Sequence, residues 1–276
     1  MGPTEVVRRA ADYLDRHGVE SPEATAETLL MHVLGTDRAG LHTRTEGLDT
    51  REARMFGRAL CQRCAGVPVQ HLTGEQAFRR ITLEVRPGVF VPRPETEILV
   101  EHALVAIEGI DAPIVVDIGT GTGAVALAMK DERPRARVRA TDLSPEAVEL
   151  ARANAERLGL DVLVLEGDLL DPLPSELEGR VDLVVSNPPY VPPEEIAELP
   201  PDVRADPWLA LAGDIALYER LGAQAARWLS PTGVVAVEID ARFGTEVAGA
   251  LERTLGQARV ERDLAGRDRV VLARRP

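Results

Sequence analysis

Four consecutive residues, Asn187-Pro188-Pro189-Tyr190 (the amide segment), bring together a side-chain amide, two prolines and an aromatic ring. The Asn187 carboxamide can accept a hydrogen bond through its oxygen and donate one through its nitrogen. Pro188 has no N–H, so it stiffens the backbone and offers a carbonyl oxygen to a ligand. Tyr190 can lay its flat face against a planar amide or base. These residue types predict a site for a planar group that carries an –NH₂.

An –NH₂ nitrogen conjugated to a carbonyl or a ring is a weak nucleophile. Two acceptors, the Asn187 oxygen and the Pro188 carbonyl, can take its two hydrogens and turn its lone pair toward an electrophile, and they stabilise the positive charge that develops on nitrogen. We therefore expect catalysis from Asn187, Pro188 and Tyr190, and substrate binding from these three and Pro189. No general base is obligatory, because the substituted nitrogen becomes acidic enough to lose its proton to a nearby acceptor or to water.

A glycine-rich stretch, residues 119–123 (the glycine loop), follows an apolar run at 114–118. Glycines let the backbone turn tightly and approach a ligand closely. Gly119, Gly121 and Ala124 also fit the dinucleotide pattern G-x-G-x-x-G/A. The loop indicates a nucleotide-like ligand without choosing between NAD and S-adenosylmethionine. The expected contacts are Gly119, Thr120, Gly121, Thr122 and Gly123.

Two acidic residues follow the next two predicted strands. Asp142 lies 19 residues after Gly123 and can accept hydrogen bonds from both hydroxyls of a ribose. The alternative role for Asp142 is to stabilise the start of the helix that Ser144 caps. Asp168 and Leu169 can meet the amino group and the face of an adenine, although Asp168 also suits an ordinary turn. Each of these roles fits either cofactor.

The amide segment decides between the two cofactors. A hydride-transfer enzyme has no use for Asn187 and Pro188, whereas methyl transfer to an –NH₂ group does. The electrophile is then the methyl group on the sulfonium of S-adenosylmethionine, transferred in line. In this arrangement we expect Asn187 to contact the cofactor as well as the acceptor.

Alternating strand and helix patterns must position these residues. Strand patterns cover residues 114–118, 137–142, 162–166, 181–186, 234–239, 258–262 and 268–274. Helix patterns between them cover about 124–130, 145–158, 214–229 and 243–255. Such alternation with buried apolar strands predicts an α/β fold with an open, mostly parallel sheet. Ligands of such sheets bind beyond the carboxyl ends of the strands.

The N-terminal part has a different pattern. Residues 1–70 show the apolar spacing of helices. Residues 81–85 and 89–91, joined by a turn at 86–88, predict a hairpin. We divide the chain into a helical domain at 1–75, a β-hairpin linker at 76–94 and a catalytic domain at 95–276.

Composition narrows the range of partners. The chain of 276 residues has a formal net charge of −13, and residues 95–276 hold 19 Arg and Lys against 33 Asp and Glu. This acidic body disfavours sequence-independent binding to nucleic acid. Without a long apolar run or a signal-peptide pattern, and with two cysteines, we expect no membrane association and a cytoplasmic location. Cys61 and Cys64 lack further ligands nearby, so we expect packing, not zinc, and no metal.

Taken together, Asp117-Ile118-Gly119-Thr120-Gly121-Thr122-Gly123 and the amide segment resemble the amino-methyltransferases of the class I S-adenosylmethionine fold. Two further segments are more specific. They are Pro68-Val69-Gln70-His71-Leu72-Thr73-Gly74 with Phe78, and Val91-Pro92-Arg93-Pro94-Glu95-Thr96-Glu97. With the helical N-terminal region, they resemble the family that methylates a protein glutamine side chain, which includes the release factor glutamine methyltransferases.

The resemblance implies a Rossmann-like, seven-stranded methyltransferase domain behind a small helical domain. It implies that the glycine loop, Asp142 and the 168–169 corner bind S-adenosylmethionine, which leaves as S-adenosylhomocysteine. It implies that the amide segment holds the glutamine of the Gly-Gly-Gln motif in class I peptide chain release factors. The N-terminal helices would dock that protein. The run from Arg93 to Glu97 is either a helix start or a lining of the cofactor pocket.

Other substrates fit the same motifs. A glutamine of a large-subunit ribosomal protein would present the same amide. An adenine amino group presents the same two hydrogens, but adenine-N6 methylation of nucleic acid predicts a basic groove, which the acidic body disfavours. A non-catalytic module that uses the fold only as a scaffold is disfavoured by the loop, Asp142 and the amide segment together. Leu169 stands where some relatives have an aromatic residue, and the loop at 212–214 is shorter than in the pattern.

Overall fold

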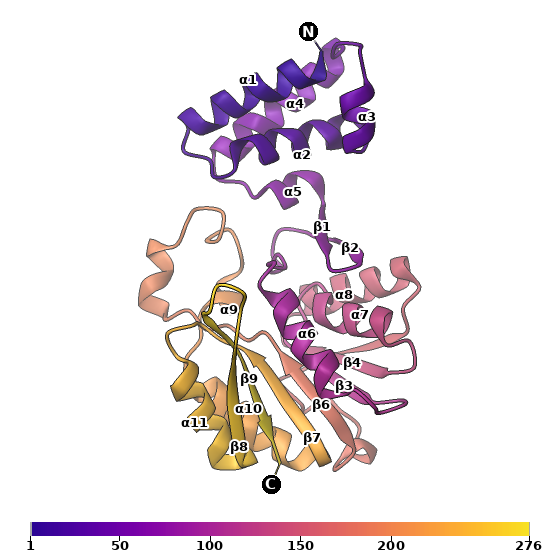
Figure 1. Ribbon diagram of the computed structural model, residues 1–276, viewed down its shortest axis with the longest axis vertical. Coiled ribbons are helices and arrows are strands. Elements are labelled where there is room, and N and C mark those ends of the chain that lie inside the picture. The colour runs from indigo at the N-terminus through magenta and orange to yellow at the C-terminus, as the bar shows by residue number, and fades with distance from the viewer. Residues whose placement is uncertain (1, 276) are drawn as a thin grey trace. The chain divides into compact units, whose positions relative to one another are not determined.

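A seven-stranded sheet forms the centre of the larger part of the molecule (Figure 1). The computed structural model describes residues 2–275. The strands lie in the order β5-β4-β3-β6-β7-β9-β8. The first five strands of this order are parallel, and β9 is antiparallel to both β7 and β8. Their bounds are β3 Ile114–Ile118, β4 Arg137–Asp142, β5 Val162–Glu166, β6 Val181–Ser186, β7 Leu229–Glu238, β8 Gln257–Arg262 and β9 Asp268–Arg274. The predicted α/β class and seven-stranded sheet are confirmed.

Helices cover both faces of this sheet (Figure 1). On one face lie α6 (Thr96–Ala106), α7 (Ala124–Glu132) and α8 (Pro145–Leu158), which share an apolar core with β3, β4 and β6. On the other lie α10 (Ile215–Trp228) and α11 (Gly244–Leu255). All five residues of β3 are buried, as expected of a strand covered on both faces.

The strand order reverses at β3. From β3 the chain moves outward to β4 and β5, and then returns to the other side of β3 as β6. Ile118 and Ser186 are register partners at the ends of β3 and β6. The two strands therefore end side by side where the strand order reverses, which is the usual ligand position in open α/β sheets.

The helical part has its own apolar core. Its elements are α1 (Pro3–Arg16), α2 (Pro22–Leu34), α3 (Arg38–Thr43), α4 (Thr50–Cys64) and α5 (Val69–Thr73). Leu14, Leu29, Leu30 and Phe56 are buried together. Helix α4 begins with a capping box in which Asp49 and Glu52 exchange hydrogen bonds with each other's main-chain N–H groups.

The chain forms two compact units, Met1–Glu75 with Pro200–Ala205, and Gln76–Leu199 with Asp206–Pro276. The short segment at 200–205 contacts the helical unit through an ion pair between Asp202 and Arg63, 3.2 Å apart. Residues 76–94 belong to the larger unit. Whether the three predicted segments act as separate domains stays a prediction.

The position of the predicted hairpin is wrong. The paired strands are β1 (Glu75–Phe78) and β2 (Ile81–Glu84), and the residues that follow the turn at 86–88 form no strand. The connecting residue Arg79 has a φ of 49°, a conformation that sequence reasoning does not expect of arginine. Arg79 is held by an ion pair with Glu132 and by its N–H, which donates to Glu97 at 2.9 Å. Tertiary contacts therefore place the turn.

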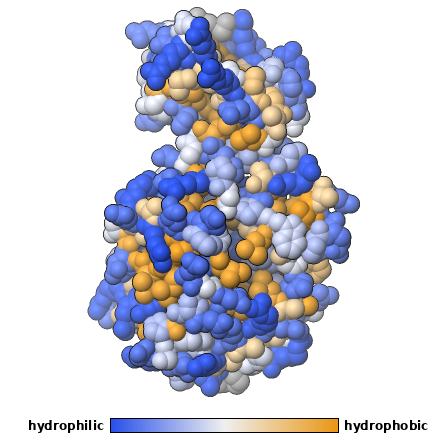
Figure 2. Space-filling model, turned by 180° about the vertical axis from the view of Figure 1, so that it is seen from behind, coloured by the Kyte–Doolittle hydropathy of each residue, from blue (hydrophilic) through white to orange (hydrophobic). Residues whose placement is uncertain are grey.

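Eight large apolar side chains are exposed among the described residues, and Figure 2 shows one face on which hydrophilic residues predominate, with apolar residues between them in each unit. Two of them, Trp208 and Leu209, are neighbours on the short helix α9 (Trp208–Leu211). Two 3₁₀ turns, η1 (Ser175–Leu177) and η2 (Pro193–Glu198), complete the described elements. Within residues 2–275, no helix combines the length and apolarity needed to cross a membrane.

Candidate functional site

The glycine loop leaves the end of β3 and is held by main-chain bonds to the neighbouring strand. The N–H groups of Gly119 and Thr120 both donate to the Thr141 carbonyl, at 2.8 and 3.0 Å. The Thr120 hydroxyl donates to Asp117 Oδ2 at 2.6 Å, and Ala126 N donates to the same oxygen at 3.1 Å. Burial raises the pKa of Asp117 to about 7. A buried carboxyl thus ties the start of the loop to the first turn of α7.

Backbone geometry explains why glycine occupies two positions of the glycine loop. Gly119 and Gly121 have φ values of 68° and 56°, which side chains other than glycine rarely adopt. A Cβ added at either residue would meet nothing within 4 Å. The backbone of the loop therefore borders open space, and a ligand can approach it closely.

The loop is also supported from α8. Asn154 is fully buried, and its Nδ2 donates to the carbonyls of Thr122 and Glu84, each at 3.0 Å. Its Oδ1 accepts from Glu84 N at 2.7 Å. Sequence reasoning missed Asn154, because nothing in the helix pattern separates it from an ordinary polar residue.

Asp142, at the end of β4, contacts the glycine loop. Its Oδ2 accepts from Gly121 N at 2.8 Å and its Oδ1 accepts from Ser144 N at 2.9 Å. Burial raises the pKa of this carboxyl. Since each carboxylate oxygen has a second lone pair, both can still accept a hydroxyl hydrogen. The two predicted roles, ligand acceptor and helix-start acid, are compatible in this geometry.

The 168–169 corner follows β5. Asp168 forms an ion pair with Arg220 on α10, and both side chains are substantially exposed. Leu169 has a φ of 47°, and its carbonyl accepts from the Thr141 hydroxyl at 2.8 Å. The Leu169 side chain is 7% exposed and packs in the core on the α10 and α11 face. The corner is therefore fixed, with most of the Leu169 side chain turned inward.

The amide segment leaves the end of β6 beside the glycine loop. Ser186 donates from its hydroxyl to the Ile118 carbonyl at 2.8 Å, which joins the two strand ends. Asn187 Nδ2 donates to Thr96 Oγ1 at 3.0 Å. Of the described residues, none donates a hydrogen bond to the Pro188 carbonyl. The Asn187 oxygen and the Pro188 carbonyl thus remain as acceptors.

A close backbone approach supports the other end of the amide segment. Val191 N donates to the Leu211 carbonyl at 2.9 Å, and Gly213 N donates to the Val191 carbonyl at 3.0 Å. A Cβ added to Gly213 would lie 1.8 Å from the Pro189 carbonyl oxygen. Only glycine fits this position without displacing the segment. The shorter loop at 212–214 noted in the sequence is therefore the loop that packs on the amide segment.

Buried polar residues surround Tyr190. Burial raises the pKa of Tyr190, and nearby Glu238 raises it further. Glu238, the last residue of β7, is 1% exposed, and burial raises its pKa to about 7. Tyr218 on α10 donates to the Glu238 carbonyl at 3.1 Å. Sequence reasoning assigned no role to Glu238, although its place at a strand end beside the amide segment was a usable signal.

The run from Arg93 to Glu97 contains a helix start, with α6 beginning at Thr96. Arg93 forms an ion pair with buried Asp206 at 2.5 Å, and Asp206 also accepts from Val91 N at 3.1 Å. Thr96 contacts the amide segment through Asn187. A contact of this run with the cofactor stays a prediction.

The residues present fit an adenosyl ligand. Thr122 is 1% exposed, and its Oγ1 has no hydrogen-bond partner among the described residues. Such an orphaned group beside an open glycine backbone and a carboxylate with free lone pairs suits a polar ligand with hydroxyl and amino groups. Across residues 2–275, no cluster of three or more His, Cys, Asp or Glu side chains could hold a metal ion. Cys61 is exposed and Cys64 is half-buried, so the expected packing role is wrong for Cys61.

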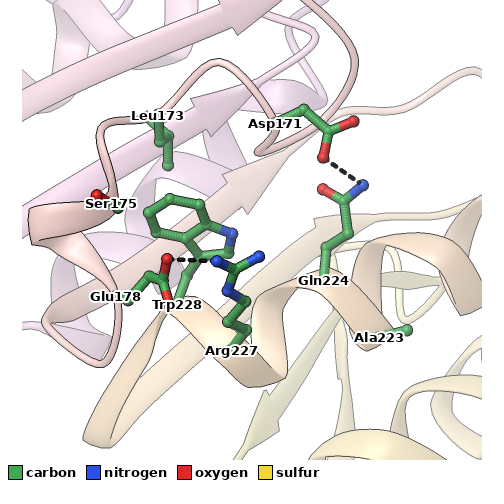
Figure 3. Close-up of a pocket in the computed structure, with 8 residues that line it drawn as sticks. All are labelled: Asp171, Leu173, Ser175, Glu178, Ala223, Gln224, Arg227 and Trp228. Carbon is green, nitrogen blue, oxygen red and sulfur yellow. Dashed lines mark hydrogen bonds and ion pairs between the residues drawn. The ribbon is translucent and has the colours of Figure 1, made fainter.

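A separate pocket of about 400 Å³ lies between η1, the loop before it and α10 (Figure 3). None of the sequence-predicted site residues lines it. Gln224 Nε2 donates to Asp171 at 3.2 Å, and Arg227 pairs with Glu178 at 2.5 Å. Because its polar side chains already bind one another, the pocket offers few free groups to a ligand.

Comparison with known proteins gives the family. The PrmC N-terminal domain model matches residues 5–74, and the methyltransferase small domain model matches residues 80–199. A release factor glutamine methyltransferase of Deinococcus radiodurans is 45% identical, with 98% of each chain covered. One of Moorella thermoacetica is 41% identical, over 98% of this chain and 96% of the relative.

A solved structure agrees on the fold. The T. thermophilus 16S rRNA N2 methyltransferase, in complex with AdoMet and guanosine, has a TM-score of 0.56 and 20% identity, over 73% of this chain and 50% of that chain. The likeness extends to the fold alone, whereas the sequence relatives cover nearly the whole chain. This chain belongs to the release factor glutamine methyltransferase family.

Proposed function

We propose that this chain transfers a methyl group from S-adenosylmethionine to the side-chain amide nitrogen, N5, of the glutamine in the Gly-Gly-Gln motif of class I peptide chain release factors. One observation carries the proposal. The amide segment and the glycine loop leave adjacent parallel strands whose last residues, Ser186 and Ile118, are register partners joined by a hydrogen bond. The amide segment, which suits a side-chain amide, and the glycine loop, which suits a nucleotide, therefore meet at one edge of the sheet.

The cofactor site is assigned to the glycine loop, Asp142, the 168–169 corner and Asn187. The loop backbone would contact the amino-acid part of the ligand, and Asp142 would accept from the two ribose hydroxyls through its free lone pairs. Asp168 and Leu169 would border the adenine, with the Leu169 side chain giving limited contact because it is mostly buried. When bound, S-adenosylmethionine supplies a methyl group on a positively charged sulfur and leaves as S-adenosylhomocysteine.

The amide site is assigned to Asn187, Pro188, Pro189 and Tyr190. Asn187 Oδ1 and the Pro188 carbonyl would accept the two hydrogens of the glutamine –NH₂. With its nitrogen donating to Thr96, Asn187 has its oxygen left for this task. The Tyr190 ring would lie against the planar amide. These contacts orient the nitrogen lone pair and stabilise the positive charge that develops during transfer, so no side chain of the segment has to act as a base.

The protein substrate would contact more than the amide site. The helical unit carries the match to the PrmC N-terminal domain model, and we assign it to docking of the release factor. Trp208 is 61% exposed on α9, whose Leu211 carbonyl accepts a hydrogen bond from Val191, the residue that follows the amide segment. An exposed tryptophan next to a site for a protein side chain suits a protein contact. The substrate acts in translation, so we place the activity in the cytoplasm.

Radiolabelled S-adenosylmethionine tests the proposal. The purified chain would be mixed separately with a class I release factor, the same factor with its Gly-Gly-Gln glutamine changed to alanine, a ribosomal protein extract and duplex DNA. We expect label on the intact release factor and none on the altered one. Label on a ribosomal protein or on DNA, with both release factors blank, would contradict the proposed substrate. Label on a ribosomal protein would instead indicate a different protein glutamine as the acceptor, and label on DNA would indicate an adenine.

A further inference from the structure

Thr96 is hydrogen-bonded to the amide segment and lies near a buried carboxylate. The residue lies at the first position of α6 and is 3% exposed. Its Oγ1 accepts from Asn187 Nδ2 at 3.0 Å, across 91 residues of sequence. A threonine hydroxyl also has one hydrogen to donate. The Glu238 carboxylate lies near the Thr96 side chain, which lowers the pKa of that carboxyl.

Sheet geometry brings Glu238 to this position. In the β6–β7 register Ser186 pairs with Val237, so the next residues along the two strands, Asn187 and Glu238, are neighbours. Glu238 is almost fully buried, and its Oε2 lacks a hydrogen-bond partner among the described residues. A buried carboxylate with spare accepting capacity draws nearby hydroxyl hydrogens strongly, because water does not compete for it.

The direction of these bonds determines how Asn187 is oriented. When Glu238 is ionised, it takes the Thr96 hydrogen, and the Thr96 oxygen then faces Asn187 as an acceptor. Only the –NH₂ end of the carboxamide can satisfy that acceptor. The Asn187 oxygen is consequently turned to the other side, where the substrate amide needs it. Without the hydroxyl, either end of the carboxamide could face α6.

We propose that Thr96 and Glu238 are positioning residues that hold the Asn187 carboxamide with its oxygen toward the substrate amide. This inference rests on the proposed function, since it assigns the orientation of the same site. Neither residue touches the reacting atoms in this account; each acts through Asn187.

Charged and titratable groups from other elements also face Glu238. They are Arg269 on β9, Glu95 before α6 and Tyr190 in the amide segment. Burial raises the pKa of Glu238 to about 7, while Thr96, Arg269 and Tyr190 act against that shift. Protonation would remove the charge that draws the Thr96 hydrogen. Turnover should therefore fall as the pH drops through about 7, with cofactor affinity unchanged.

Three variants and a control test the positioning role. Thr96→Val removes the hydroxyl at nearly constant shape, Thr96→Ser keeps it, and Glu238→Gln removes the charge. Thr25→Val, at a buried threonine of α2, controls for loss of a buried hydroxyl elsewhere. Thermal unfolding of each variant establishes that it folds.

We expect Thr96→Val to lower kcat roughly 10- to 100-fold, as expected for a misaligned catalytic group, with the Kd for S-adenosylmethionine and the KM for the acceptor within about twofold of wild type. Thr96→Ser should recover most of kcat. Glu238→Gln should abolish the fall in kcat below about pH 7. An unchanged kcat in Thr96→Val, no rescue by serine, or a persisting acid limb in Glu238→Gln would each overturn the inference.

A second readout does not depend on activity. The Asn187 side-chain –NH₂ signals in an isotope-labelled protein are assigned by their loss in Asn187→Ala. In the wild type they should exchange slowly with water and shift as the pH passes about 7, and in Thr96→Val both properties should be lost. If these signals behave so but no acceptor is methylated, the proposed function fails and the positioning pair stands. If methylation occurs but Thr96→Val leaves the signals unaltered, the positioning pair fails alone.

Discussion

The glycine loop and the amide segment leave neighbouring strands, but different contacts hold them in place. The loop is held mainly by residues of its own strand–helix–strand unit, such as Asp117, Thr141 and Asp142, and it accepts one further hydrogen bond from Asn154 on the next helix. The amide segment is held by Thr96, which lies 91 residues earlier, and by Gly213 in a later loop. The loop is thus mainly a local structure of one strand–helix–strand unit, whereas the amide segment is assembled by the tertiary fold.

This difference has a functional consequence. A loop fixed by its own neighbourhood should bind the cofactor even when the amide segment is disturbed. The amide segment should be sensitive to changes in distant elements that leave the loop intact. Cofactor affinity and turnover should therefore respond to separate sets of substitutions.

Asn187→Ala is expected to separate the effect on turnover from the effect on cofactor affinity most strongly. Loss of one acceptor from the amide segment should reduce kcat by about 10²- to 10³-fold, as for removal of an oriented group that stabilises charge in the transition state. The Kd for S-adenosylmethionine should change little, because the loop and Asp142 remain. Calorimetry for the cofactor and labelled-methyl transfer for turnover check both values. A turnover equal to wild type would exclude Asn187 from catalysis.

The reverse pattern is expected from Asp142→Ala. Two hydrogen bonds to a charged group are lost from the ribose, worth about 3 kcal/mol or more together, so the Kd for the cofactor should rise roughly 100-fold. At saturating cofactor, kcat should stay near that of the wild type. Titration by calorimetry gives the Kd, and an unchanged affinity would remove Asp142 from the cofactor site.

Gly213→Ala tests support of the amide segment from outside. The added Cβ would lie 1.8 Å from the Pro189 carbonyl oxygen, so the segment must move. We expect kcat to fall about 10-fold or more with cofactor affinity retained, in line with the cost of a small misplacement. Gly249→Ala in α11 is the matched control, since its Cβ would meet nothing within 4 Å. Equal turnover in the two variants would show that the close approach has no role.

A smaller effect is expected from Trp208→Ala, which removes an exposed aromatic side chain next to the amide segment. If Trp208 contacts the acceptor protein, the KM for that protein should rise about 10-fold, and the cofactor Kd should not change. Steady-state kinetics with intact release factor as the varied substrate measures this. An unaltered KM would place the protein contact elsewhere.

The smallest expected effect is on the pH dependence of folding stability, and it involves the glycine loop alone. Folded Asp117 keeps its proton up to about pH 7, whereas the ordinary value for the group is 3.8. Between these values the folded state binds the extra proton, so the contribution of Asp117 to stability falls as the pH rises through this window. Urea unfolding at about pH 5 and about pH 8 should show a smaller pH difference for Asp117→Asn than for the wild type. Identical pH differences would mean that Asp117 ionises normally.

The same difference between the two regions explains what the sequence could predict. The strand–helix alternation placed the strands of the sheet, and the glycine loop with Asp142 was recognisable because its parts lie within one unit. Glu238 was given no role, and the contacts of Thr96 and Gly213 with the amide segment were not predicted, because only the folded sheet brings these three residues to it. The hairpin was misplaced because Arg79 turns the chain with a positive φ, which its contacts with Glu97 and Glu132 support.

Methyl transfer to a glutamine side-chain nitrogen leaves a product whose chemistry tests the proposed reaction most directly. Release factor labelled by this chain would be hydrolysed in strong acid, which cleaves side-chain amides. Label on the amide nitrogen leaves as methylamine, and we predict that nearly all of it is recovered in that form, with about 10²- to 10³-fold less from Asn187→Ala in the same reaction time. Label that stays on an amino acid, or that is released as methanol from a methyl ester, would contradict the account.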